Sequence, residues 1–243
     1  MLGGPSLPWG QAPEALLQAL EHSASYGLTQ DALYFDAYTA HGANTLPPDR
    51  REHAAEIVAC FQEAAQRGII PGGELPRFWA MGEACFYFYD GVWSSDKLPA
   101  GEPIPWLQLV FGDCYFAHFA GGGYEQYLPG SGVDWWPDRN PRLYELLFAC
   151  APSYNWLPNG QVPVEWDDPA TMKRWRWLRI WNAYFRAVAS SEMVSHEFLS
   201  ADRKGQRVAF ANGAVAEFDM AANRFRVWGV PGFEGRWIVA PQL

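Results

Sequence analysis

An apolar run, a patterned helix and a second apolar run follow one another between residues 32 and 74. Residues 32–38 (ALYFDAY) are almost continuously apolar, which is typical of a strand covered on both faces. A helix follows residues 47–49 (PPD), carries its apolar side chains on one face and stops at Gly68. Residues 69–74 (IIPGGE) then form a short strand. This order predicts a βαβ crossover, whose two strands must be parallel.

The same type of sheet is predicted to continue along the chain. The apolar runs Ala84–Tyr89 and Ile104–Phe111 are expected to add strands, and a fifth strand unit is considered at 148–156. Helices are predicted from Pro13 to about Gly27, over 140–150, and from Asp168 to about Val194. The fold class is therefore α/β.

The last residues change in character. Residues 207–210 and 215–218 flank Asn212-Gly213, which is a strong signal for a two-residue hairpin, and 224–230 and 236–239 are predicted to be further strands. We place a boundary near Ser200. The predicted organisation is a barrel-type region over 1–200 and a small antiparallel β unit over 201–243.

Composition limits the classes of partner. With 243 residues, 49% of them hydrophobic, the chain can bury a core typical of one α/β domain, and its net charge of -9 argues against broad nucleic-acid binding. We see no export signal and no apolar stretch long enough for a membrane span, so the expected location is the cytoplasm. The four cysteines (Cys60, Cys85, Cys114 and Cys150) are widely spaced and are expected to be reduced, buried thiols.

Two carboxylates close the strands of the predicted crossover. Asp36 ends the first apolar run and Glu74 ends the second. Active sites of α/β sheets are assembled at the carboxyl ends of their strands, where a carboxylate can be solvated. Neighbouring strands lie about 4.7–4.9 Å apart, close to the roughly 5–5.5 Å between the carboxyl groups of retaining glycosidases. The alternative is that both residues cap the following helices or bind an arginine such as Arg77.

Residues 33–38 (LYFDAY) and 69–74 (IIPGGE) resemble the catalytic strands of the endo-α-N-acetylgalactosaminidase group and related barrel glycosidases, in which one strand ends in Asp and a later strand ends in Glu. The resemblance implies that Asp36 is the nucleophile and Glu74 the general acid/base of a retaining α-glycosidase. Residues 104–113 (IPWLQLVFGD) look like a late barrel strand, and 207–213 (RVAFANG) like the β unit after the barrel. The similarity begins near Ala32 and covers most of the chain.

The chain departs from the family pattern in the number of its strands. Family members have a complete eight-stranded barrel, whereas we count four clear strand units here before the β unit, and counterparts of the first three barrel strands are missing. Uncovered sheet edges tend to associate. We therefore expect a partial or partner-completed (β/α) barrel: a homo-oligomer, a chain completed by a partner, or a fragment.

Several residues near the predicted strand ends are candidates for substrate binding. Aromatic rings pack against the C–H faces of sugars, and the chain has 13 Trp, 11 Tyr and 15 Phe, although core packing is the alternative for each of them. Aspartates after apolar runs are further candidates, with turns and caps as their alternative. The candidates are Tyr38, His41, Trp79, Trp106 and Asp113, with Asp90 and Asp96 as secondary ones.

Other motifs point to no additional chemistry. The basic and aromatic segment 173–179 is interpreted as a core-facing amphipathic helix rather than a nucleic-acid site. His196-Glu197 has no second histidine at zinc-helix spacing, Gly121–Gly123 lacks the lysine of a phosphate loop, and Ser131 does not match a nucleophile elbow. We predict no metal and no cofactor.

The sequence thus predicts a retaining glycoside hydrolase that acts on α-linked sugars through two carboxylates. The alternative is a non-catalytic carbohydrate-binding or scaffold protein derived from such an enzyme, and a third reading is a structural fragment. Activity of Asp36 and Glu74 variants separates these hypotheses.

Overall fold

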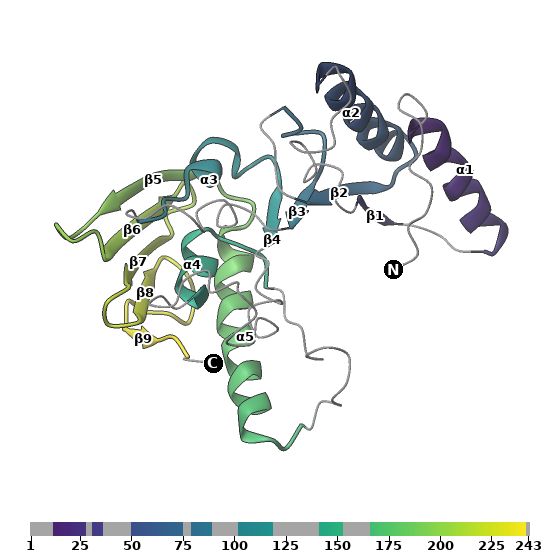
Figure 1. Ribbon diagram of the computed structural model, residues 1–243. Coiled ribbons are helices and arrows are strands. Elements are labelled where there is room, and N and C mark those ends of the chain that lie inside the picture. Colours follow the sequence, from purple (N-terminus) through teal and green to yellow (C-terminus); the bar gives the residue numbers. More distant parts are fainter. Residues whose placement is uncertain are drawn as a thin grey trace, which may run out of the picture. The chain divides into compact units, whose positions relative to one another are not determined.

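The computed structural model describes residues 12–27, 31–35, 50–74, 79–88, 102–118, 141–152 and 166–241 (Figure 1). By their internal contacts the residues divide into two compact units, Met1–Phe88 and Tyr89–Leu243. Each unit is described by itself below.

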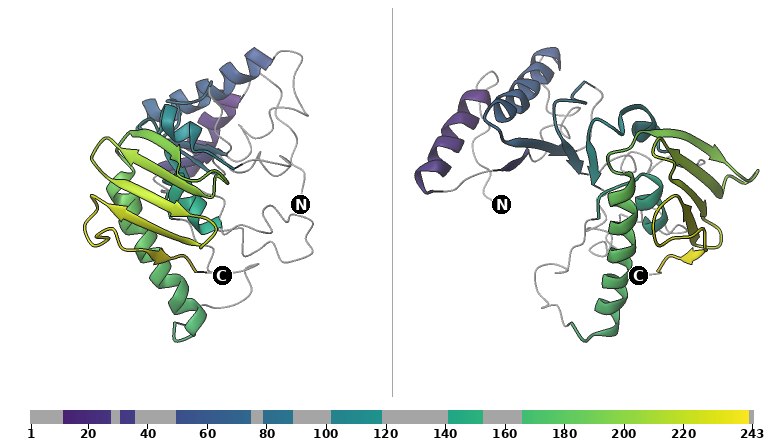
Figure 2. Two further views of the ribbon diagram at one scale, coloured as in Figure 1. Left: turned by 90° about the vertical axis from the view of Figure 1, so that its left-hand side faces the viewer. Right: turned by 180° about the vertical axis from the view of Figure 1, so that it is seen from behind.

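The first unit contains the predicted crossover. Strand β2 pairs in parallel with β1 on one side and with β3 on the other, which confirms the parallel arrangement and the strand expected within Ala84–Tyr89. Helix α1 packs beside α2 (Figure 2). The elements, in chain order, are α1 (Ala12–Ser25), β1 (Ala32–Phe35), α2 (Arg50–Gln66), β2 (Ile70–Glu74) and β3 (Phe86–Phe88).

Helix α2 covers the parallel strands with one apolar face. Its buried residues are spaced three or four apart, as the sequence pattern requires, and the Phe61 ring meets Phe35 of β1 edge-on at 5.1 Å. The chain leaves the helix through Gly68, whose φ of 75° is a conformation that glycine adopts readily. The buried residues of this face are Ile57, Cys60, Phe61 and Ala64.

The second unit combines helices with an antiparallel sheet in which β5 to β9 follow chain order within the described residues. The predicted hairpin around Asn212-Gly213 is present as β6 and β7. The elements are α3 (Trp106–Phe111), β4 (Phe116–His118), α4 (Pro141–Leu147), α5 (Pro169–Val188), β5 (Met193–Phe198), β6 (Gly205–Phe210), β7 (Val215–Asp219), β8 (Arg224–Trp228) and β9 (Ile238–Val239).

The prediction of a strand at Ile104–Phe111 is wrong, because this segment forms helix α3. A short apolar run has no periodicity that separates a strand from a buried helix. Burial within the segment follows the helical turn, since Leu107 is buried while Trp106 and Val110, four residues apart, are 50% and 60% exposed. Strand β4 begins five residues after α3 and was not predicted.

Of the strand unit considered at 148–156, the described part is Phe148–Pro152. Within it, the Ala151 N–H donates to the Ala117 carbonyl of β4 at 2.6 Å. The remaining residues of that segment lie outside the described ranges.

Helix α5 packs its apolar face against the antiparallel sheet. Figure 2 (left) shows the helix behind the strands, and the Trp177 ring meets Phe225 of β8 edge-on at 5.8 Å. Trp177, Trp181 and Tyr184 are buried, which confirms that this helix faces the core. Asp168 is the N-cap of this helix, since its carboxylate accepts the Thr171 backbone N–H at 2.7 Å.

The helix ends earlier than expected. It stops at Val188 instead of near Val194, and Met193 already begins β5. Turn residues at 189–191 separate the two elements, and Met193 is buried where β5 pairs with β6, so packing in the sheet overrides the helical pattern. The division into regions 1–200 and 201–243, like the partial barrel, stays a prediction.

The cysteines differ in their environments. All four are free; Cys60 and Cys150 are buried as expected, whereas Cys85 and Cys114 are exposed. The expectation of four buried thiols was wrong for the latter two, because they lie in bends between elements and apolar sequence neighbours do not ensure burial there. Burial and the nearby Glu56 raise the pKa of the Cys60 thiol to about 11, which makes this thiol unreactive.

The outward face of the antiparallel sheet carries a ladder of charges. Glu217 of β7 lies between Arg207 of β6 and Arg226 of β8 in the strand register. Arg207 Nε donates to Glu217 Oε1 at 2.9 Å, and Arg226 Nε donates to Glu217 Oε2 at 2.8 Å. Glu217 is only 4% exposed. Two arginines therefore satisfy a buried carboxylate on what is otherwise the solvent side of the sheet.

This ladder makes stability depend on pH. Burial disfavours the charged form of Glu217, but the hydrogen bonds from Arg207 and Arg226 outweigh burial and hold the pKa of this carboxyl below its usual value. A lowered folded-state pKa stabilises the protein above the unfolded-state pKa, and this stabilisation is lost as the pH falls through the folded-state value.

Glu217→Gln is accordingly expected to lower the free energy of unfolding at neutral pH by about 1.5–3 kcal/mol, the range for hydrogen bonds to charged groups. Urea unfolding of both proteins between about pH 7 and about pH 3 checks this, since the difference should shrink as the glutamate protonates. A difference that stays constant over this range would contradict the assignment.

Candidate functional site

The carboxyl ends of β1 and β2 lie side by side in the first unit. Phe35, the last residue of β1, pairs with Gly73 of β2, and Glu74 follows Gly73 as the last residue of that strand. Glu74 in turn pairs with Phe88, the last residue of β3. Asp36 follows Phe35 in the sequence but lies outside the described residues. The register therefore aligns the residues that directly precede the two predicted catalytic carboxylates.

Backbone hydrogen bonds to the segments on either side hold strand β2 in the sheet. Residues 71–73 (PGG) are buried, although proline and glycine are poor strand formers. The Ile70 N–H donates to the Asp31 carbonyl at 2.9 Å, and the Cys85 N–H donates to the Pro71 carbonyl at 2.8 Å. A Cβ at Gly72 would overlap the ring of Phe86 in β3. The ring thus requires a glycine at this position, two residues before Glu74.

Gly72→Ala is therefore expected to destabilise the protein by about 1–3 kcal/mol, because the added methyl must displace the Phe86 ring in a packed region. Urea unfolding measures this cost. A Phe86→Ala change supplies the control: if the two side chains compete for one space, the double variant should be less destabilised than the sum of the single variants. Strict additivity would contradict the steric explanation.

Trp79 is the predicted substrate-binding residue that the structure describes in the same unit as Glu74. It is partly buried and lies in the turn residues between β2 and β3, next to the fully buried Ala80. The neighbouring Glu83 accepts a hydrogen bond from Gln62 of α2 at 3.1 Å. The candidates Tyr38, His41, Asp90 and Asp96 lie outside the described residues.

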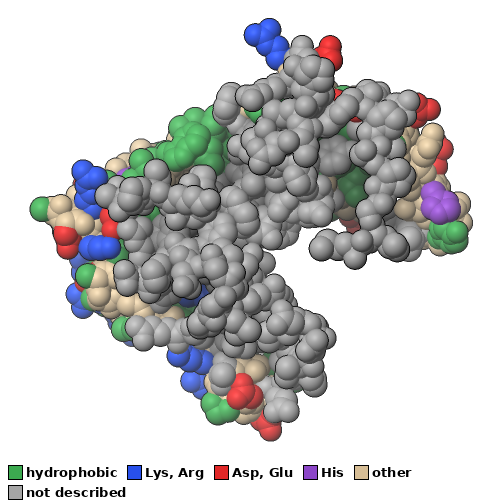
Figure 3. Space-filling model, in the orientation of Figure 1, with side chains coloured by type: hydrophobic (Ala, Val, Ile, Leu, Met, Phe, Trp, Pro, Cys, Tyr) green, Lys and Arg blue, Asp and Glu red, His purple; other side chains and the backbone are tan. Residues whose placement is uncertain are grey.

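Trp106 and Asp113 belong to the second unit and flank helix α3. Trp106 begins the helix, and Asp113 follows its last residue, Phe111, by two positions; the Asp113 carboxylate accepts from the Cys114 thiol at 3.4 Å. Helix α3, and not the predicted strand, directly precedes Asp113, so Trp106 and Asp113 do not lie at a strand end as expected; their roles in substrate binding stay predictions. Figure 3 shows hydrophobic side chains gathered on the surface over α3.

Helix α4 holds a buried ion pair that was not predicted from the sequence. Arg142 Nη1 donates to Glu145 Oε1 at 2.6 Å, and their side chains are 3% and 0% exposed. The neighbouring Tyr144 hydroxyl donates to Glu102 at 3.0 Å, and Glu102 also pairs with Lys204 at 2.7 Å. An arginine and a glutamate three residues apart inside a short predicted helix were a signal for this pair, but its burial depends on tertiary packing.

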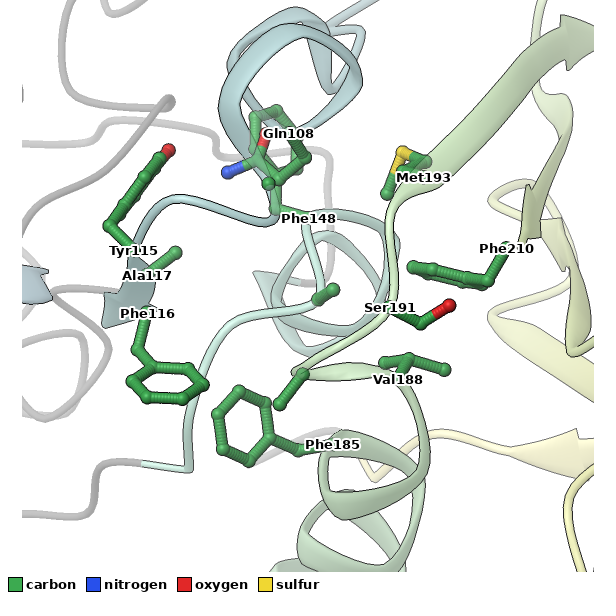
Figure 4. A pocket seen from close by; sticks show the side chains of 13 residues that line it. Gln108, Tyr115, Phe116, Ala117, Phe148, Phe185, Val188, Ser191, Met193 and Phe210 are labelled. Atoms are coloured by element: carbon green, nitrogen blue, oxygen red, sulfur yellow. The ribbon is translucent and has the colours of Figure 1, made fainter. Parts of the chain in front are cut away.

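Two hollows of the second unit differ in size. The smaller one, between α3, β4 and the end of α5 (Figure 4), has a volume of about 20 Å³ and is lined largely by aromatic and aliphatic side chains such as Phe116, Phe185 and Met193. A volume of this size admits about one water molecule and no sugar. An open groove of about 570 Å³ lies between α5 and β9, with Lys173 and Arg176 on one wall.

Within the ranges that the structure describes, no cluster of His, Cys, Asp and Glu could hold a metal ion. In the same ranges no helix combines the length and apolar character needed to cross a bilayer.

Comparison with known proteins identifies the fold. No family model matches the sequence, and no curated protein matches it. Solved structures of the α-N-acetylgalactosaminidase NagBb from Bifidobacterium bifidum do match: a quadruple mutant with 24% identity and a TM-score of 0.66, and a GalNAc complex with 21% identity and a TM-score of 0.65. A third, a Gal-NHAc-DNJ complex, has 22% identity and a TM-score of 0.66. The chain shares their fold.

The likeness covers 90% of this chain but only 34% to 35% of the NagBb chains. The chain thus spans about a third of the length of these glycosidases. This confirms, at the level of the fold, the resemblance to barrel glycosidases that the sequence indicated.

Proposed function

We propose that the chain carries the catalytic carboxylates of a retaining glycoside hydrolase that acts on α-linked sugars, with α-N-acetylgalactosaminides as the substrate class. The observation that supports this most directly is the register of the parallel strands, in which Phe35 and Gly73 are partners and each directly precedes a predicted catalytic carboxylate. The fold shared with NagBb, an α-N-acetylgalactosaminidase, supports this choice of substrate class.

The proposed mechanism has two steps. Asp36 attacks the anomeric carbon and forms a glycosyl ester, while the Glu74 carboxyl donates its proton to the departing glycosidic oxygen. Glu74, now a carboxylate, then takes a proton from a water molecule that attacks the same carbon and releases Asp36. Two inversions leave the product with the configuration of the substrate.

The test is hydrolysis of an aryl α-N-acetylgalactosaminide by the purified chain, followed by proton NMR of the first product formed. We expect the α-anomer to appear first and to mutarotate afterwards. Initial release of the β-anomer would contradict the retaining mechanism. Hydrolysis of other α-glycosides with no hydrolysis of this one would contradict the substrate class.

A second candidate function is carbohydrate binding without turnover. The observation in its favour is that the chain spans about a third of the length of the NagBb structures, whereas glycosidase sites of barrel enzymes draw on several strands. Binding of α-N-acetylgalactosamine without hydrolysis would favour it. We propose that in either case the chain associates with a second copy or with a partner that completes the barrel. Light scattering on the pure, folded protein tests self-association.

A further inference from the structure

An exposed tryptophan lies over two arginines on the outward face of the antiparallel sheet. Trp237, just before β9, is 38% exposed, and the guanidinium carbons of Arg224 and Arg226 each lie 4.5 Å from its ring centroid. The two arginines are two residues apart in β8 and therefore project from the same face of the strand. Both guanidinium groups lie against the indole, and 38% of the Trp237 surface remains exposed to solvent.

The groups beneath Trp237 are fixed in place. Arg226 also stacks on Trp228, with 4.6 Å between the guanidinium carbon and the ring centroid. A Cβ at Gly235 would overlap Trp228, so this indole rests directly on the backbone. Cation–π stacking and ion pairing therefore hold the indole and guanidinium groups in one arrangement, and a ligand that binds there loses little side-chain freedom.

Charges on this face are balanced. Arg226 is paired with Glu217, and Arg224 donates to Asp219 through both Nε and Nη2 at 3.1 and 3.0 Å. Arg207 bridges Glu217 and Glu197. Three guanidinium groups thus face three carboxylates, although the chain as a whole carries a net charge of -9. Such a surface favours neither polyanions nor polycations, but it offers many polar atoms at fixed positions.

From this arrangement we propose that Trp237 and its supporting ladder form a carbohydrate-binding surface outside the proposed catalytic site. The exposed indole would stack against the C–H face of a neutral sugar ring, and the hydroxyl groups at the rim of that ring would bond to the arginine and aspartate groups around it. Because the Trp237 indole is exposed on the face of the sheet, we take the ligand to be a sugar within an oligosaccharide or glycopeptide rather than an enclosed monosaccharide. Only the choice of sugar rests on the proposed function.

Affinity chromatography of the full chain on a resin that carries α-N-acetylgalactosaminides tests this proposal. Asp36→Asn serves as the background in all samples, so that turnover cannot remove the ligand. We expect Trp237→Ala and Trp237→Met to weaken binding about tenfold, which is typical of losing one aromatic stacking partner, and Trp237→Tyr to bind with intermediate affinity. Trp166→Ala, at a tryptophan that is 63% exposed, is the matched control and should bind as the background protein does.

The unfolding midpoint of each variant is first compared with that of the background protein. If Trp237→Ala is unstable, Trp237→Met is used in its place, because it retains a large apolar side chain. Failure of the background protein to bind the resin, or equal binding by the Trp237→Met variant, would overturn the proposal. Stronger retention on heparin than on the sugar resin would also overturn it, since the surface would then be an anion site. Failure of the proposed catalysis would instead appear as absent hydrolysis by the unmutated chain, measured separately, with Trp237-dependent binding intact in the Asp36→Asn background.

Discussion

Replacing Asp36 by Asn is expected to lower kcat/KM for an aryl α-N-acetylgalactosaminide on the order of 10³-fold or more, because the amide cannot form the glycosyl ester. Glu74→Gln should act differently. A good aryl leaving group departs with little protonation, so its release is affected less than that of an alkyl or sugar leaving group, which needs the proton. Rates on a series of leaving groups therefore assign the two roles.

Matched carboxylates in the same unit control for charge and folding. Asp31 precedes β1, at the opposite end of the strand from Asp36, and Glu83 bonds Gln62 instead of closing a strand. Asp31→Asn and Glu83→Gln should retain activity within about twofold, as surface substitutions away from a site usually do. If neither Asp36→Asn nor Glu74→Gln changes the activity, the catalytic assignment is wrong.

Glu145→Ala is expected to destabilise the protein by about 3–5 kcal/mol, because it removes one charge from a buried ion pair. The Arg142 Nη1 and Glu145 Oε1 atoms are 2.6 Å apart, and the two side chains are 3% and 0% exposed. Guanidinium or thermal unfolding measures the change.

The double variant Arg142→Met, Glu145→Leu separates charge burial from packing. Removing both charges avoids an uncompensated ion, and hydrophobic residues of similar size are often tolerated in place of a buried pair. We expect it to be more stable than Glu145→Ala. A double variant as unstable as the single one would show that the two side chains matter for their shape or for other contacts.

The sequence predicted best where a long pattern and a boundary signal agreed. Helix α2 has a full apolar face and a glycine stop, and α5 has an aspartate cap, so the end of α2 and the start of α5 were placed well. Local signals also predicted the β6–β7 hairpin, because Asn212-Gly213 satisfies its turn. Burial in a strand overrode the helical pattern beyond Val188.

The errors arose where a segment was short. Residues 104–111 are apolar throughout, so a helix and a strand are equally compatible with their composition, and the resemblance to a barrel strand favoured the wrong one.

For the candidate site, chain order was enough to predict that β1 and β2 are parallel neighbours, and the register confirms it. The roles of Asp36 and Glu74 stay predictions. The arginine and tryptophan stack and the pair in α4 depend on contacts between residues distant in sequence, which no local pattern contains.

The antiparallel sheet has a consequence for how the protein acquires its structure. Within the described residues, each of strands β5 to β7 pairs with the next strand along the chain across a short connection, so few intervening residues must be ordered before each contact forms. Strands β1 and β2 instead meet only after a whole helix has been enclosed between them. Because local contacts form faster than distant ones, the C-terminal sheet should assemble early, and the carboxyl ends of β1 and β2 would be aligned late.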